Sequence, residues 1–276
     1  MNGIIWVAAV MAVVCRAFPA AADFYVIAGG GKAGTQITSV PYTITSPGLY
    51  CLSRNLTYSN STGYAITVTV SGVTLDLMGF SLSGNGKNSY TTTGIFVNAE
   101  LEGVEIRNGT VTSFGGYGIF TQGCKGVRLI GLRVQDNGGM GVRIQGSNHL
   151  AMGCSFLDNG GIGATIGQSL IKGNQAYGNT GGLHISSGSV ISGNVCLNNS
   201  AIGISTGTGC SVLDNSVMGS GSYGINVSDG CTVKGNTCRG NTGGGINTGN
   251  DCLIAHNCTQ GLTVGSSCHA VENHTY

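Results

Sequence analysis

A period of 21 residues runs through the C-terminal half of the chain and constrains its fold more than any other feature. It is carried by equally spaced asparagines, Asn194, Asn215, Asn236 and Asn257. A second marker, a glycine followed by an apolar residue, recurs with the same spacing at Gly182-Leu183, Gly203-Ile204, Gly224-Ile225 and Gly245-Ile246. A fixed period of this size is the signature of structural repeats that stack on one another.

The composition decides which kind of repeat is stacked. The chain has 50 glycines and only 8% charged residues, and apolar residues do not recur at helical spacing. Each repeat instead holds short alternating runs such as Val142-Arg143-Ile144, separated by the Gly, Asn and Ser clusters typical of turns. We therefore predict an all-β chain that folds as a parallel β-helix.

Stacking the repeats in register predicts columns of like residues inside the solenoid. One asparagine column contains Asn174, Asn194, Asn215, Asn236 and Asn257. A second, interrupted by Ser220, contains Asn137, Asn159, Asn179, Asn199 and Asn241. An apolar column contains Val134, Phe156, Ala176, Cys196, Val217 and Cys238. Stacked amides can hydrogen-bond to their copies and to the turn backbone, so both asparagine columns are expected to be buried.

Three N-terminal segments carry a resemblance to a known superfamily. The stretches 42–56, 72–84 and 104–110 resemble the opening coils of the right-handed β-helix in the pectin-lyase-like superfamily. The later repeats resemble that family's coils, so the resemblance covers roughly residues 40–265. It implies a single-stranded right-handed parallel β-helix of about ten coils. The superfamily includes lyases, hydrolases, epimerases, adhesins and tailspikes, so the resemblance alone selects no chemistry.

The first residues have the features of a secretory signal. An apolar core from Ile4 to Val14 is too short to span a bilayer, and Ala20-Ala21-Ala22 offers a cleavage site before Asp23. We predict a signal peptide at 1–22, an N-terminal extension and cap at 23–63, the β-helix at 64–265 and a C-terminal tail at 266–276. The protein is expected to be secreted or at the cell surface, or periplasmic in a Gram-negative bacterium, with no membrane span in the mature chain.

The net charge restricts the possible binding partners, and the cysteine spacing restricts the possible disulfides. Removing Arg16 with the signal leaves 11 basic and 11 acidic residues, which argues against a nucleic-acid partner. Cys196 and Cys238 share a column but lie two coils, about 9.6 Å, apart, which is too far for a disulfide. Cys210, Cys231 and Cys252 stack in another column and could form at most one bond. We interpret the cysteines as small core side chains.

One outward-facing column is the first candidate site. The middle residues of the strands that begin with the glycine marker predict a column that starts with Phe96 and Phe120 and continues through Arg143 and His184. Aromatic faces beside hydrogen-bonding groups are what a sugar ring requires, so these four are the predicted glycan-binding residues. The alternative is that a loop at 84–93 or an N-terminal flap covers both phenylalanines.

A pair of carboxylates is the second candidate site. Asp136 and Asp158 are 22 residues apart and would stack on neighbouring coils, where they could hold Ca²⁺. A basic residue beside them, with Arg133, Arg143 and Lys172 as candidates, would then abstract a proton from a uronate. The alternative is that both aspartates only form turns, because each begins an Asp-Asn-Gly-Gly sequence.

The absence of catalytic sequence motifs favours some of the possible functions over others. The chain contains no Asp-Asp, Gly-His or Asp-Pro-His sequence, although the superfamily's hydrolases and alginate epimerases carry such motifs. The leading hypothesis is a protein that binds or organises a polysaccharide or cell-surface glycan without catalysis and without a cofactor. The alternatives are a calcium-dependent polysaccharide lyase acting on a uronate polymer and a purely structural surface protein, including an ice-binding stack.

Overall fold

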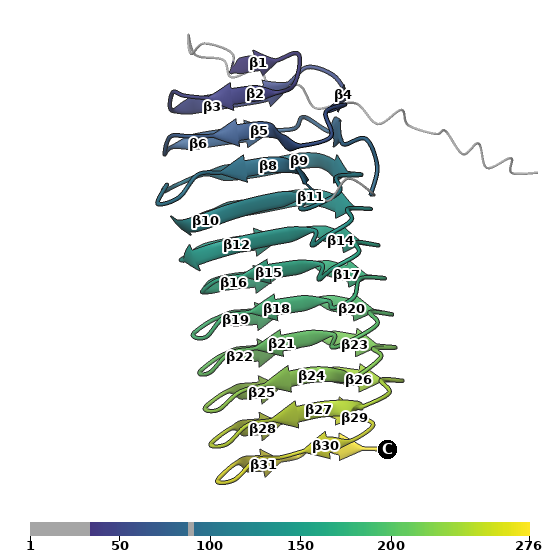
Figure 1. Ribbon diagram of the computed structural model, residues 1–276. Helices are drawn as coiled ribbons and strands as arrows, with labels where there is room; N and C mark the ends of the chain where they lie inside the picture. The colour runs from purple at the N-terminus through teal and green to yellow at the C-terminus, as the bar shows by residue number, and fades with distance from the viewer. Residues whose placement is uncertain (1–33, 88–90) are drawn as a thin grey trace, which may run out of the picture. The chain divides into compact units, whose positions relative to one another are not determined.

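The computed structural model describes residues 34–87 and 91–276 as one stack of β-coils (Figure 1). Within these residues the chain consists of strands and turns, without a helix. It follows that this part of the chain also has no helix long and apolar enough to cross a membrane. The predicted signal peptide, residues 1–22, lies outside the described residues.

Each full coil contributes one strand to each of three lines that run the length of the stack. Line 1 contains β2 (Tyr42–Ile44), β5 (Gly63–Val68), β8 (Thr92–Val97), β10 (Ile119–Lys125), β12 (Val142–Ser147), β15 (Ala164–Ile166), β18 (Leu183–Ile185), β21 (Ile204–Thr206), β24 (Tyr223–Val227), β27 (Gly244–Thr248) and β30 (Leu262–Thr263). Line 2 follows it in each coil and contains β1 (Thr35–Ile37), β3 (Gly48–Leu52), β6 (Val73–Asp76), the first halves of β9 (Glu105–Thr112) and β11 (Arg128–Gln135), β13 (His149–Met152), β16 (Ser169–Lys172), β19 (Val190–Ser192), β22 (Ser211–Leu213), β25 (Thr232–Lys234), β28 (Leu253–Ala255) and β31 (His269–Val271). Line 3 completes the coil with β4 (Leu56–Thr57), β7 (Ser81–Ser83), the second halves of β9 and β11, β14 (Ser155–Leu157), β17 (Gln175–Tyr177), β20 (Val195–Leu197), β23 (Ser216–Met218), β26 (Thr237–Arg239), β29 (Cys258–Thr259) and β32 (His274–Thr275).

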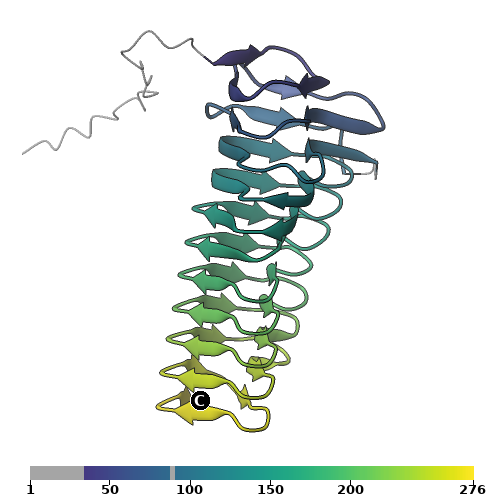
Figure 2. The same ribbon diagram turned by 90° about the vertical axis from the view of Figure 1, so that its left-hand side faces the viewer.

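Every strand pairs in parallel with the strand one coil away, as in β15 with β18 and β19 with β22. The coils therefore stack along one axis, which is visible in the turned view (Figure 2). The predicted all-β solenoid of about ten coils is confirmed. Its strands extend past the predicted bounds of 64 and 265, because β1 to β4 add strands before residue 64, and β31 and β32 pair onto the stack after residue 265.

The core is a set of columns rather than a single cluster. The predicted apolar column is confirmed by the pairing of Val134 with Phe156, Ala176 with Cys196 and Val217 with Cys238. Each of these six side chains is fully buried. Cys196 and Cys238 are free thiols separated by one intervening coil, as predicted. Burial raises the pKa of both thiols, so they behave as apolar packing groups.

Polar ladders line the three corners between the strand lines. Asn174 to Asn257 form the predicted first ladder between lines 2 and 3, and Asn273 extends it by one coil. Asn137 to Asn241 form the predicted second ladder between lines 3 and 1, and Ser220 interrupts it. The third corner, between lines 1 and 2, carries His149, Ser169, Ser189, Cys210, Cys231, Cys252 and Cys268. In all three ladders a side chain accepts a hydrogen bond from a backbone N–H one coil away, which satisfies a buried donor.

Candidate functional site

The predicted outward column lies on line 1 in the expected order. Phe96 of β8 pairs with Phe120 of β10, and Phe120 pairs with Arg143 of β12. Thr165 of β15 then separates Arg143 from His184 of β18. The structure thus brings the first three residues into direct succession, whereas His184 lies two coils, about 9.6 Å, beyond Arg143.

Two tyrosines turn the phenylalanine pair into an aromatic cluster. The rings of Tyr64 and Phe96 stack with centroids 4.3 Å apart, and those of Phe96 and Phe120 are 5.6 Å apart. Tyr117 stacks on Phe120 at 5.0 Å. We call Tyr64, Phe96, Phe120 and Tyr117 the aromatic cluster. Phe96 is 8% exposed because Tyr64, which is 40% exposed, covers it. The accessible ring surface therefore belongs to Tyr64, with partial contributions from Tyr117 and Phe120.

Arg143 is fixed at the edge of this cluster. Its guanidinium carbon lies 5.7 Å from the centroid of the Phe120 ring. One of its terminal nitrogens, Nη1, donates a hydrogen bond of 3.2 Å to the hydroxyl of Tyr117. A guanidinium carries five N–H donors, so this contact leaves others available to a ligand. The cation–π contact and the hydrogen bond together hold the donors in one orientation.

A shallow cavity of about 360 Å³ lies beside Tyr117, where line 3 turns into line 1. We call its lining the glycine trough: Gly115, Gly116, Gly138, Gly139, Gly160 and Gly161, with Tyr117 and Met140. The glycines come from turns on three successive coils, and backbone bonds such as Gly138 N to Phe114 O (2.7 Å) and Gly160 N to Asn137 O (2.8 Å) join the turns. A Cβ atom on Gly138 or Gly160 would collide with a backbone carbonyl of the preceding coil, so these positions require glycine.

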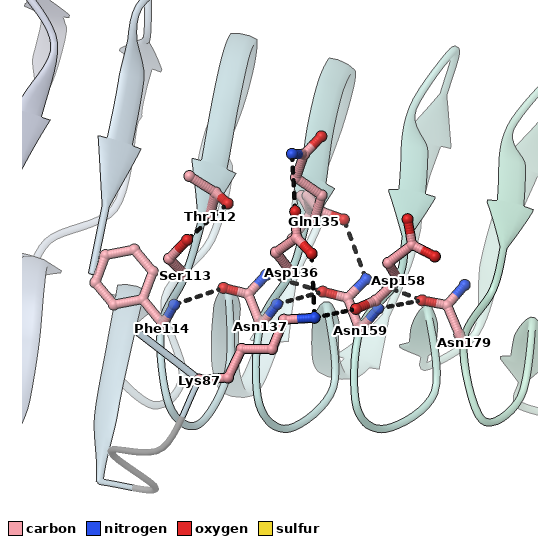
Figure 3. A network of polar contacts seen from close by, with 11 residues as sticks. Lys87, Thr112, Ser113, Phe114, Gln135, Asp136, Asn137, Asp158, Asn159 and Asn179 are labelled. Atoms are coloured by element: carbon pink, nitrogen blue, oxygen red, sulfur yellow. Dashed lines mark hydrogen bonds and ion pairs between the residues drawn. The ribbon is translucent and has the colours of Figure 1, made fainter. Parts of the chain in front are cut away.

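The two predicted metal ligands lie in the same row of turns, just before the second asparagine ladder (Figure 3). Asp136 and Asp158 both have left-handed backbone conformations, with φ of 54° and 51°. Lys87 places its ammonium 3.1 Å from Oδ1 of Asp136 and donates to the carbonyl of Asp158 at 3.1 Å. The carboxylate of Asp136 thus already faces a cation of the same chain. Within residues 34–87 and 91–276, no three His, Cys, Asp or Glu side chains gather in a way that could hold a metal ion.

The structure does not bring the predicted basic residues together. Arg133 lies in the second half of β11 on line 3, Arg143 lies in β12 on line 1, and Lys172 lies in β16 on line 2. Of the three, Arg133 is nearest in sequence to Asp136, but Arg133 and Asp136 are separated along the strand by Val134 and Gln135. The three alternative bases therefore lie on three different faces of the coil, and the pairing of one of them with Asp136 and Asp158 stays a prediction.

The sequence reasoning missed Tyr64, the glycine trough and Lys87. A signal for the trough was present, because glycine pairs follow Asn137 and Asn159 at equivalent places in neighbouring coils. Tyr64 gave no such signal, since its strand lies before the repeat becomes regular. Lys87 belongs to the segment between β7 and β8, which is longer than the corresponding segments of the later coils.

The chain matches a β-helix family model and resembles several solved β-helix proteins. The family model of the right-handed β-helix region matches residues 44–189 and 93–242. Among solved structures, the periplasmic alginate epimerase AlgG shares 14% identity at a TM-score of 0.60, covering 79% of this chain and 61% of its own. Endopolygalacturonase I from Stereum purpureum, solved with two galacturonates, shares 14% identity at a TM-score of 0.58, covering 88% and 92%.

The enzymatically active domain of tailspike protein 2 from bacteriophage CBA120 shares 16% identity at a TM-score of 0.56, covering 84% of this chain and 43% of its own. The chain thus spans less than two thirds of the epimerase and of the tailspike. A comparison with curated proteins finds no match. At these identities the solved structures show a common fold, while the family model extends over more than half of the residues. The chain belongs to the right-handed β-helix family.

Proposed function

We propose that this protein binds a polysaccharide or cell-surface glycan across the aromatic cluster and the glycine trough, without catalysing its cleavage. The observation that carries the proposal is the continuous stack of Tyr64, Phe96, Phe120 and Tyr117 at the edge of an open cavity. Aromatic faces pack against the C–H faces of sugar rings, and the nearby guanidinium of Arg143 offers N–H donors to sugar oxygens.

The trough suits an extended sugar chain because its floor is backbone. Glycine allows a flat ligand to approach the main chain more closely than any side chain would permit. The turn N–H groups are already bonded between coils, as in Gly139 N to Gly116 O at 2.8 Å, so the floor is formed before a ligand arrives. A preformed surface lowers the entropic cost of binding. His184, exposed two coils further on, would contact a chain lying along the solenoid axis.

The neighbours support a glycan partner at the level of class. The printed names of the similar structures include an alginate epimerase and an endopolygalacturonase bound to galacturonate. Neither name transfers a reaction to this chain, because the likeness is one of fold. The proposal of binding without catalysis is supported by the missing superfamily motifs and by the contact between Lys87 and Asp136.

The test is retention of the protein on an array of neutral and acidic polysaccharides. We expect Tyr64→Ala and Phe120→Ala each to weaken binding about two- to tenfold, because an aromatic contact contributes about 0.5–1.5 kcal/mol beyond its buried area. Tyr177→Ala is the matched control, since Tyr177 is equally exposed, at 39%, but lies on line 3. Equal loss in all three variants, or none in the first two, would refute the site.

The lyase alternative is tested on the same preparation. A lyase would release unsaturated products that absorb in the near ultraviolet from a uronate polymer, would depend on Ca²⁺, and would lose turnover in Asp136→Asn and Asp158→Asn. We expect no product from the wild-type protein at any calcium concentration. We also expect both aspartate variants to bind glycan as the wild type does. Calcium-dependent product release would replace the binding proposal with the catalytic one.

A further inference from the structure

Four cysteines occupy successive coils at the third corner of the solenoid. The backbone N–H of Cys210 points at the sulfur of Cys231 at 3.3 Å, and that of Cys231 points at Cys252 at 3.4 Å. The N–H of Cys252 points at the sulfur of Cys268 at 3.2 Å. We call these four residues the thiol file. All four are free thiols in the structure.

The last member differs from the other three in accessibility. Cys210, Cys231 and Cys252 are 1–2% exposed, whereas Cys268 is partly exposed on the last coil. In-register neighbours in a parallel sheet have Cα atoms about 4.8 Å apart, inside the range that a disulfide bridges. The residues that follow the two cysteines, Leu253 and His269, are paired in register, and the sulfur of Cys268 lies 3.2 Å from the backbone nitrogen of Cys252, so the two cysteines are direct neighbours on adjacent coils. Burial is the main cause that raises the pKa of Cys252, and the neighbouring thiol of Cys268 adds to it.

We propose that Cys252 and Cys268 form a reversible disulfide on contact with a small-molecule disulfide such as oxidised glutathione. The Cys268 thiolate attacks one sulfur of glutathione disulfide, which forms a mixed disulfide and releases one glutathione thiolate. The sulfur of Cys252 then loses its proton to solvent and attacks the sulfur of Cys268, which releases the second glutathione thiolate. In sum, two protein thiols are oxidised to one disulfide and one glutathione disulfide is reduced to two glutathiones.

The disulfide would fasten the end of the stack. Cys268 follows Cys252 by 16 residues, compared with the period of 21 in the preceding coils, so the last coil is short. Its strands β31 and β32 are largely exposed and pair with the stack on one side only. A covalent bond between neighbouring coils would suppress the local opening of this coil, which is supported on one side only.

The proposal is tested with the purified native protein and oxidised glutathione. After quenching with an alkylating agent and denaturation, peptide mass spectrometry should show a Cys252–Cys268 disulfide that a reductant removes. Hydrogen exchange of the amides in β31 and β32 should slow at least severalfold in the oxidised protein. In Cys252→Ser, Cys268 should instead retain glutathione as a stable mixed disulfide.

Cys258 supplies the matched control inside the same molecule. It is also partly exposed, but its register neighbours are Thr237 and His274, so it has no cysteine directly across from it. Cys258 should therefore take up glutathione without converting it to an internal disulfide. The proposal fails if Cys268 of the wild type keeps glutathione while Cys252 stays a free thiol. It also fails if Cys268 pairs with a cysteine other than Cys252.

Discussion

The amide of Asn215 illustrates how much of the fold one side chain supports. Its Oδ1 accepts hydrogen bonds of 2.9 Å from both the backbone nitrogen and the side-chain amide of Asn194. Its Nδ2 donates to Ile191 O and to Asn236 Oδ1, both at 3.0 Å. One residue thereby joins three coils and satisfies backbone groups at a corner where the strand ladder is broken.

Replacing Asn215 with leucine should therefore destabilise the protein. The variant leaves the N–H of Asn194 and the carbonyl of Ile191 buried without partners, which costs about 1–3 kcal/mol. Urea denaturation would measure the change in the free energy of unfolding. Asn226→Leu is the control, because the half-buried Asn226 side chain lies outward on β24, where it accepts a hydrogen bond from Asn247. An equal loss in both variants would contradict the role of the ladder.

His149 makes the third ladder sensitive to pH. It is 3% exposed and accepts a hydrogen bond from the N–H of Val127 through Nδ1, and burial lowers its pKa to about 4. Because the folded-state pKa lies below the unfolded value, its contribution to stability is complete above pH about 6.5. Between pH about 6.5 and about 4 the unfolded chain binds a proton that the folded chain refuses, so stability falls as the pH falls.

We expect this residue to contribute a loss of about 2–3 kcal/mol across that range, because each unit of pKa difference corresponds to about 1.4 kcal/mol. Denaturation of the wild type and of His149→Gln at pH 7 and pH 4.5 would measure it, since the glutamine cannot titrate. The variant should lose less stability on acidification than the wild type.

At the scale of single residues, the sequence predicted the side chains that recur at equivalent positions of the coils. It did not predict the contacts of residues in irregular coils. Both asparagine ladders could be read from the spacing because each rung occupies an equivalent place in its coil. Asn273 and Cys268 escaped the same search because the last coil is shorter than the period. The cover of Tyr64 over Phe96 could not be foreseen, since it depends on where a strand of an irregular coil begins.

At the scale of the elements, the turns after line 3 stack from coil to coil as regularly as the strands do. The glycine pairs of three turns stack so closely that the turns form one continuous floor. Lys87, which follows β7, reaches the backbone carbonyl of Asp158 in this row, 71 residues away in sequence. The sequence showed the strands and turns of the coils, but a segment without repeats gave no register from which its contacts could be derived.

Gly138→Ala should disturb this floor. The added methyl group meets the carbonyls of Lys87 and Gly115, so we expect the free energy of unfolding to fall by about 1–3 kcal/mol through overpacking. Gly209→Asn is the control, because Gly209 has a φ of 63° with open space around it, and asparagine tolerates that conformation. Thermal unfolding of the two variants would distinguish a steric requirement from a conformational one. A stable Gly138→Ala protein would contradict the close stacking of the turns.

At the scale of the whole molecule, the stability of each coil depends mainly on the coils next to it along the solenoid axis. Each coil contacts mainly its two neighbours, so the terminal coils are supported on one side only. We expect amide hydrogen exchange to be slowest in central strands such as β18 and β21 and progressively faster toward β31 and β32. Mass spectrometry of peptides after timed labelling would show this gradient. Uniform exchange along the described chain would indicate that it opens as a single cooperative unit instead.

The stacking of parallel strands also determines how this molecule would respond to mechanical tension. The hydrogen bonds between coils run along the solenoid axis, so a pull along that axis meets one coil's bonds at a time rather than all together. Each released coil of 21 residues would free about 70 Å of extended chain. A chain wound in this way would lengthen in nearly equal steps under tension along the axis, while the coils that remain wound keep their surface intact.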